Sequence, residues 1–138
     1  MVSGNLPDYH VRAKAAYEKS LAVTGPVPVG VRNQAHVGLA QALEQQTSAG
    51  QERNQLRREA VVHLLAVFYG RHLKPGEKLD LYWRRQSGLI SQRLLTDLGS
   101  FDQALQICAE LKKDFPGMRP GLKDREQQIN KLKAAKQP

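Results

Sequence analysis

Proline and glycine residues recur at regular intervals along the chain, and because both interrupt helices and strands they limit what it can fold into. The breaks lie at 4–8, 25–30, 47–51, 73–77, 98–100 and 115–121. Apolar residues between them recur three and four positions apart, which is typical of amphipathic helices. The β-branched stretch 24–31 contains two prolines, so we expect a loop there. The sequence predicts an all-α fold of about six helices, over 9–23, 31–46, 53–72, 77–97, 101–115 and 120–135.

Several of these helices carry end signals. Asp8 is the expected N-cap of the first helix, and Ser100 that of the fifth. Gly99 is expected to end the fourth helix, because glycine readily adopts the conformation that closes a helix. Lys112 and Lys113 lie in the last turn of the fifth helix, where positive charge favours the helix dipole.

The apolar positions predict which side of each helix is buried. The third helix contains the most apolar stretch, AVVHLLAVFY, and is expected to be central. The sixth is apolar along one thin edge, as in a helix at the end of a stack. The expected core positions are Ala35, Leu39, Ala42 and Leu43 in the second helix; Leu79, Trp83, Ile90 and Leu94 in the fourth, extended by Tyr82 and Leu89; and Leu122, Ile129 and Leu132 in the sixth.

The sequence contains no pattern that carries catalysis or metal binding. Cys108 is the single cysteine, which excludes an internal disulfide, and its helical spacing indicates packing in the core. The histidines, at positions 10, 36, 63 and 72, lie on different segments and form no i, i+4 pair. No phosphate-binding glycine loop or nucleophile elbow occurs. We therefore expect no enzyme activity, no metal site and no cofactor.

The chain has a net charge of +8. Such an excess suits an anionic partner, so a basic helical nucleic-acid-binding protein is one alternative. The basic residues are dispersed, however, without a run of five like charges. No apolar run approaches the ~18 residues that a membrane span needs, and no signal peptide is visible. The single cysteine is compatible with a reducing or an oxidising compartment, so the compartment stays open.

One spacing of residues recurs along the chain. A small residue is followed four positions later by a larger residue and three positions after that by a small or apolar residue, with proline further on. The three copies begin at Ala13, Ala60 and Ala104, and their members are Ala13, Tyr17 and Ser20; Ala60, Leu64 and Val67; and Ala104, Cys108 and Leu111. The spacing resembles the second half of a tetratricopeptide repeat, while Leu39, Ala40 and Leu43 resemble its first helix.

This resemblance implies a right-handed α-solenoid of antiparallel helical hairpins that occupies residues 1–138 as one domain, with 118–138 as a C-terminal capping helix. The three alanines are 47 and 44 residues apart, whereas the family period is about 34, so the hairpins must be elongated. Such hairpins resemble those of bacterial envelope-associated repeat proteins; a generic solenoid with a HEAT-like period is the alternative. The first helix lacks its hairpin partner, so we expect a fragment of a longer array whose exposed end could pair in a homodimer.

In tetratricopeptide proteins the first helix of each hairpin lines a groove that binds peptides. Carried over by alignment, the groove residues are Gln34, Gln41, Gln45, Gln86, Arg93 and Asp97. The resemblance therefore implies a protein–protein interaction scaffold with a protein or peptide partner. The alternatives are the nucleic-acid-binding protein and a structural oligomerisation segment.

Overall fold

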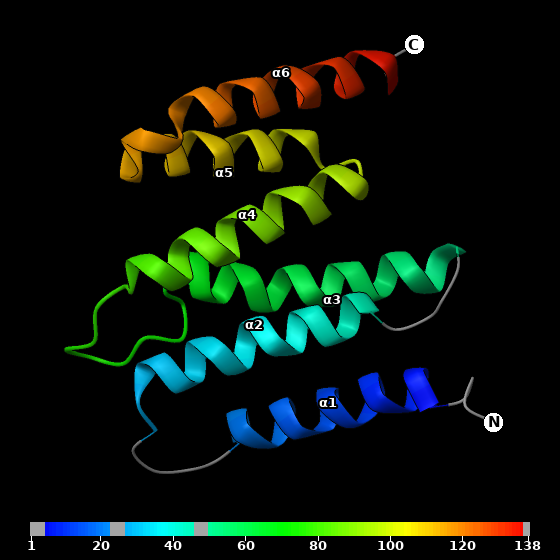
Figure 1. Ribbon diagram of the computed structural model, residues 1–138, viewed down its shortest axis with the longest axis vertical. Helices are drawn as coiled ribbons and strands as arrows, with labels where there is room; N and C mark the ends of the chain where they lie inside the picture. The colour runs from blue at the N-terminus through cyan, green and yellow to red at the C-terminus, as the bar shows by residue number, and fades with distance from the viewer. Residues whose placement is uncertain (1–4, 23–26, 46–49, 137–138) are drawn as a thin grey trace. The chain divides into compact units, whose positions relative to one another are not determined.

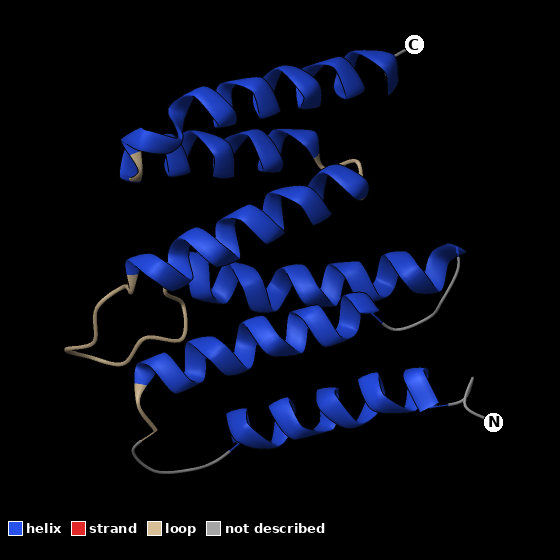
Figure 2. Cartoon of the chain, in the orientation of Figure 1, coloured by secondary structure: helices blue, strands red, loops and turns tan. Residues whose placement is uncertain are grey.

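The computed structural model describes residues 5–22, 27–45 and 50–136. These residues form six α-helices and one short 3-10 helix, and no strand occurs among them (Figure 1, Figure 2). The all-α prediction is confirmed. The helices are α1 Asn5–Ala22, α2 Val29–Gln45, α3 Gly50–Phe68, α4 Leu81–Asp97, α5 Phe101–Asp114 and α6 Arg119–Lys136, with the 3-10 helix η2 Pro116–Met118 before α6.

The chain forms two compact units, residues 1–87 and 88–138, and the division between them falls within α4. Unit 1 holds α1, α2, α3 and the beginning of α4. Unit 2 holds the rest of α4 together with α5, η2 and α6. Within the described residues, no helix is both long and apolar enough to cross a membrane.

In unit 1, α2 packs against both α1 and α3. The predicted stripe of α2 is buried: Ala35, Leu39, Ala42 and Leu43 are each at most 5% exposed. Small residues allow helices to approach closely, and Gly38 of α2 faces the ring of Tyr17 in α1. From α3 the core receives Ala60, Val61, Leu64, Val67 and Phe68.

The connection between α3 and α4 differs from the prediction. We expected helices to reach residue 72 and to restart at residue 77, but α3 ends at Phe68 and α4 begins at Leu81. Gly70 adopts a φ of +69°, and the N–H of Arg71 donates to the carbonyl of Ala66 at 2.8 Å. This hydrogen bond closes the helix in the manner of a glycine C-cap.

Asp80 caps the start of α4, because its carboxylate accepts a hydrogen bond from the N–H of Trp83 at 3.2 Å. The later start corrects the predicted apolar face of this helix. Leu79 lies before the helix and is 43% exposed, and Tyr82 is 54% exposed. Trp83 is half-buried and packs edge-on against the ring of Tyr82.

Two other end signals also need correction. α1 begins at Asn5, so Asp8 lies inside the helix and not at its N-cap. Ser100 occupies the N-cap position of α5, but its hydroxyl makes no capping hydrogen bond. Gly99, by contrast, ends α4 as predicted, with a φ of +79° and the following N–H bonded to the Leu95 carbonyl at 2.8 Å.

In unit 2, α5 packs against α6. Ala104, Ile107, Cys108 and Leu111 of α5 are buried, as are Leu122 and Ile129 of α6. Leu132, the third member of the predicted edge, is 44% exposed. Two ion pairs also join these helices, Lys112 with Glu126 at 2.7 Å and Lys133 with Asp102 at 2.6 Å.

Candidate functional site

A hollow of about 450 Å³ lies within unit 2. It is lined by residues from α4, from η2 and from the first two turns of α6, namely Leu89, Gln92, Gly117, Met118, Gly121, Leu122 and Arg125. Its size falls in the range of pockets that bind small ligands or single side-chain anchors. We call this hollow the unit 2 groove.

Arg125 supplies the charge of the groove. Its Nε donates to the amide oxygen of Gln92 at 2.8 Å, and its Nη1 donates to that of Gln128 at 3.2 Å. Both acceptors are neutral, and no carboxylate in the described part of the chain pairs with this guanidinium. Of the two acids adjacent to Arg125 in the sequence, Asp124 and Glu126, the second forms an ion pair with Lys112. Arg125 is half-buried, so the groove contains a positive charge that the fold does not neutralise.

The rest of the groove is mostly apolar and open. Leu89 and Met118 are half-buried and therefore reachable from solvent. A Cβ atom built at Gly117 or Gly121 would meet no other atom within 4 Å. The two glycines therefore leave space at the groove that a side chain could fill.

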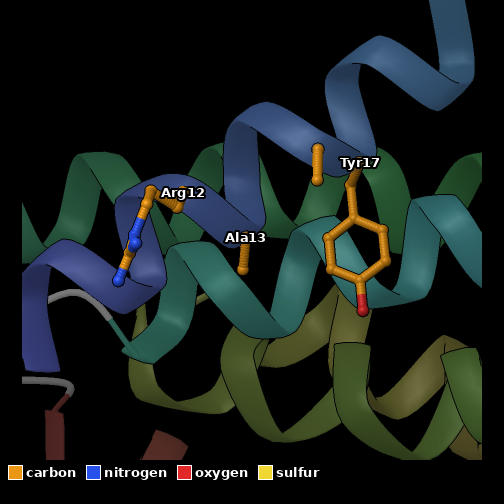
Figure 3. Close-up of a pocket in the computed structure, with 4 residues that line it drawn as sticks. Arg12, Ala13 and Tyr17 are labelled. Carbon is orange, nitrogen blue, oxygen red and sulfur yellow. The ribbon is translucent and has the colours of Figure 1, made fainter.

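A second, more open hollow of about 590 Å³ lies in unit 1 along α1. Figure 3 shows its lining residues Arg12, Ala13 and Tyr17 on one side of the helix, with the Tyr17 ring directed toward α2. Ala16 also lines the hollow and is exposed. Among the lining residues that the structure describes there is one charged side chain and no cluster of polar groups, and they suggest no particular ligand.

The six predicted groove residues lie on two helices. Gln34, Gln41 and Gln45 are exposed at intervals of seven and four along α2, in unit 1. On α4, Gln86 is half-buried, while Arg93 and Asp97 are exposed one turn apart. None of the six lines the unit 2 groove, whose contributions from α4 are Leu89 and Gln92. The assignment of the six to a binding surface stays a prediction.

Unit 1 contains a cluster of three histidines that the sequence did not reveal. His36 lies on α2, His63 on α3, and His72 on the connection that follows α3. The Nδ1 atoms of His36 and His63 are 3.0 Å apart, which is a hydrogen-bond distance. The ring of His36 lies 5.3 Å from that of His63 and 5.0 Å from that of His72, measured between centroids.

Polar neighbours attach this cluster to the start of α2. The Nε2 of His72 lies 2.5 Å from the amide oxygen of Asn33, a buried residue. The Nδ1 of His72 is buried and has no hydrogen-bond partner. Arg32 donates to the Glu77 carboxylate through both Nη atoms and to the carbonyl of Val27 at 2.7 Å.

The environment of the cluster favours neutral imidazoles. Burial, followed by the charges of His72, His63 and Arg32, lowers the pKa of His36 to about 4. Burial also lowers the pKa values of His63 and His72. The side chain of Glu77 instead favours its charged form, because hydrogen bonds from Arg32 and from the Lys74 N–H lower its pKa to about 2.

The described residues offer no group of three His, Cys, Asp or Glu side chains that could hold a metal ion. Cys108 is fully buried in the α5 core, as predicted, and burial raises the pKa of its thiol to about 11. A protonated, buried thiol is a poor nucleophile.

No family model, no curated protein and no solved structure matches this chain.

Proposed function

We propose that the protein is a protein–protein interaction scaffold, and that the unit 2 groove binds a peptide segment with one apolar anchor and one carboxylate. The observation that carries this proposal is the guanidinium of Arg125, which borders an apolar hollow without an acidic partner in the described chain. Charged groups at such positions are normally paired, and a ligand carboxylate would complete the pair.

Each part of the ligand has a matching part of the groove. An apolar side chain would contact Leu89, Met118 and Leu122, which line the hollow. An arginine side chain carries five N–H donors, and the hydrogen bonds to Gln92 and Gln128 use two of them. The remaining N–H groups can donate hydrogen bonds to a carboxylate. Residues 88–138 contain nine Lys and Arg against six Asp and Glu, which also favours an acidic partner.

The repeat-like packing supports a scaffold role. Ala60 and Ala104, at equivalent places in the recurring spacing, are both fully buried. The larger residues that follow them, Leu64 and Cys108, are also fully buried. This burial agrees with hairpins of the tetratricopeptide type, in which short side chains let two helices lie close together. The family and the solenoid arrangement are part of the proposal.

A peptide library tests the proposal. We would label nine-residue peptides that carry one leucine and one glutamate at varied spacing, and measure fluorescence polarisation with the whole chain. Some peptides should bind, and Gly121→Leu should abolish their binding because the new side chain fills open space at the groove. Gly121→Ala is the matched control and should bind normally.

Two results would contradict the proposal. One is a library without any binder. The other is binding that Gly121→Leu leaves unchanged, while circular dichroism shows both variants to be helical. Tight binding of a labelled single-stranded oligonucleotide that weakens steeply with salt would instead support the nucleic-acid alternative.

A further inference from the structure

We propose that His36, His63 and His72 form a proton-operated latch that holds the connection 69–80 against the start of α2 and releases it in mild acid. This inference concerns unit 1 and is independent of the groove in unit 2. It rests on three imidazoles from three parts of the chain: the rings of His63 and His72 lie 5.3 and 5.0 Å from that of His36, measured between centroids.

The contacts of the latch require uncharged imidazoles. The hydrogen bond between the Nδ1 atoms of His36 and His63 needs one bare nitrogen, so the pair cannot keep it with both rings protonated. Asn33 presents an amide oxygen to the Nε2 of His72, which makes Nε2 the donor and leaves Nδ1 bare. That Nδ1 is buried without a hydrogen-bond partner, and burial opposes the addition of a proton to this ring.

Charged groups on every neighbouring element act on the cluster. Protonation of the imidazoles is opposed by Lys14 of α1, near His63, and by Arg32 of α2, near His36 and His72. It is favoured by Glu18 of α1 and Glu59 of α3, near His63, and by Glu77 of the connection, near His72. Burial is the largest influence on all three rings and favours the neutral form.

The direction of the pH effect follows from these lowered pKa values. The unfolded chain takes up protons on histidine below pH 6.5, while the folded cluster resists them until about pH 4 at His36. The stabilisation by the neutral cluster is therefore complete above pH 6.5 and is lost between 6.5 and about 4. The ion pair of Glu77 with Arg32 begins to lose its contribution only below about pH 4.5, the ordinary pKa of the carboxyl, so it does not account for a loss that is already present at pH 5.

Urea unfolding measured by the fluorescence of Trp83 tests the latch. The folding equilibrium constant of the wild-type chain should fall roughly ten-fold or more between pH 7.5 and pH 5. In His36→Gln the logarithm of the folding equilibrium constant should fall by less than half as much over the same pH range. Glu77→Gln is the comparison: it removes the ion pair and also a charge that favours protonation of His72, so the pH dependence should be at least as steep as in the wild type.

A second measurement needs no variant and separates release of the connection from general loosening. Amide hydrogen exchange, corrected for its intrinsic pH dependence, should rise at pH 5 in residues 71–78 more than in α5 and α6. The latch is wrong if exchange rises equally in both regions, if wild-type stability is the same at both pH values, or if His36→Gln keeps the full dependence. Should His36→Gln fail to fold, proton NMR of wild type decides: one imidazole must titrate at least about one unit below 6.5.

Discussion

A methyl group at residue 38 would lie 2.3 Å from Cζ of Tyr17, so α1 and α2 meet where glycine leaves room for the aromatic ring. Alanine normally stabilises a helix interior by about 1 kcal/mol relative to glycine. At residue 38, however, the Tyr17 ring would have to move to make room for the alanine methyl group. In a Tyr17→Ala background, Gly38→Ala should gain that amount, whereas in the wild type it should destabilise.

A double-mutant cycle measured by urea unfolding checks this contact. The expected coupling between the two positions is about 1–2 kcal/mol. If Gly38→Ala had the same effect in both backgrounds, the close approach of α1 and α2 at this point would be refuted.

Arg84 joins the beginning of α4 to the end of α3. Its guanidinium donates to the carbonyl of Phe68 and lies 4.1 Å from the centroid of the Phe68 ring. Arg84→Lys should cost about 1–3 kcal/mol, because lysine reproduces neither the planar stacking nor this hydrogen-bond geometry. Arg85→Lys, at an exposed position, should change stability by less than about 0.5 kcal/mol. Equal effects of the two substitutions in urea unfolding would argue against the buried contact.

Alanine substitutions at Gly70 and Gly76 distinguish the cost of backbone strain from the cost of steric crowding. Both have positive φ, +69° and +87°, so alanine at either should cost about 1–2 kcal/mol. At Gly70 the new Cβ would also lie 2.8 Å from Leu73 Cδ1 and 2.9 Å from Leu79 Cδ2, whereas at Gly76 it would meet nothing within 4 Å. Thermal unfolding should therefore show Gly70→Ala to be the more damaging substitution. The opposite order would place the end of α3 elsewhere.

Cys108 should be unreactive in the native protein. Its side chain is fully buried and its thiol pKa is raised to about 11, so little thiolate is present at pH 8. A thiol reagent such as DTNB should label it slowly in buffer and rapidly in urea. Rapid labelling of the folded chain would contradict its place in the core of α5.

The helices could be predicted because their signals are local. Gly99 marks the end of α4 in the sequence, and the alanine and leucine spacing of α2 gives its buried side. The α3–α4 connection was misplaced because the apolar pattern continues past Phe68, while Gly70 ends the helix. Asp80 was a usable N-cap signal that the prediction overlooked.

The two candidate sites depend on contacts between distant residues, which local patterns do not show. His36 and His63 are 27 positions apart, and Gln92 and Arg125 are 33 apart. A usable signal did exist for the first site: His36 lies between the buried residues Ala35 and Val37, and His63 interrupts the most apolar stretch of the chain. For the second, nothing in the sequence marked Arg125 among the other basic residues of α6.

The central claim is that Arg125 of the unit 2 groove recognises a carboxylate. The most direct measurement compares the affinity of the best library peptide with that of its glutamate-to-glutamine analogue, for the wild type and for Arg125→Gln. We predict that the wild type prefers the glutamate peptide roughly ten-fold and that Arg125→Gln loses the preference while still binding the glutamine analogue. A preference that Arg125→Gln keeps in full would show that the charge is recognised elsewhere, and the groove assignment would be wrong.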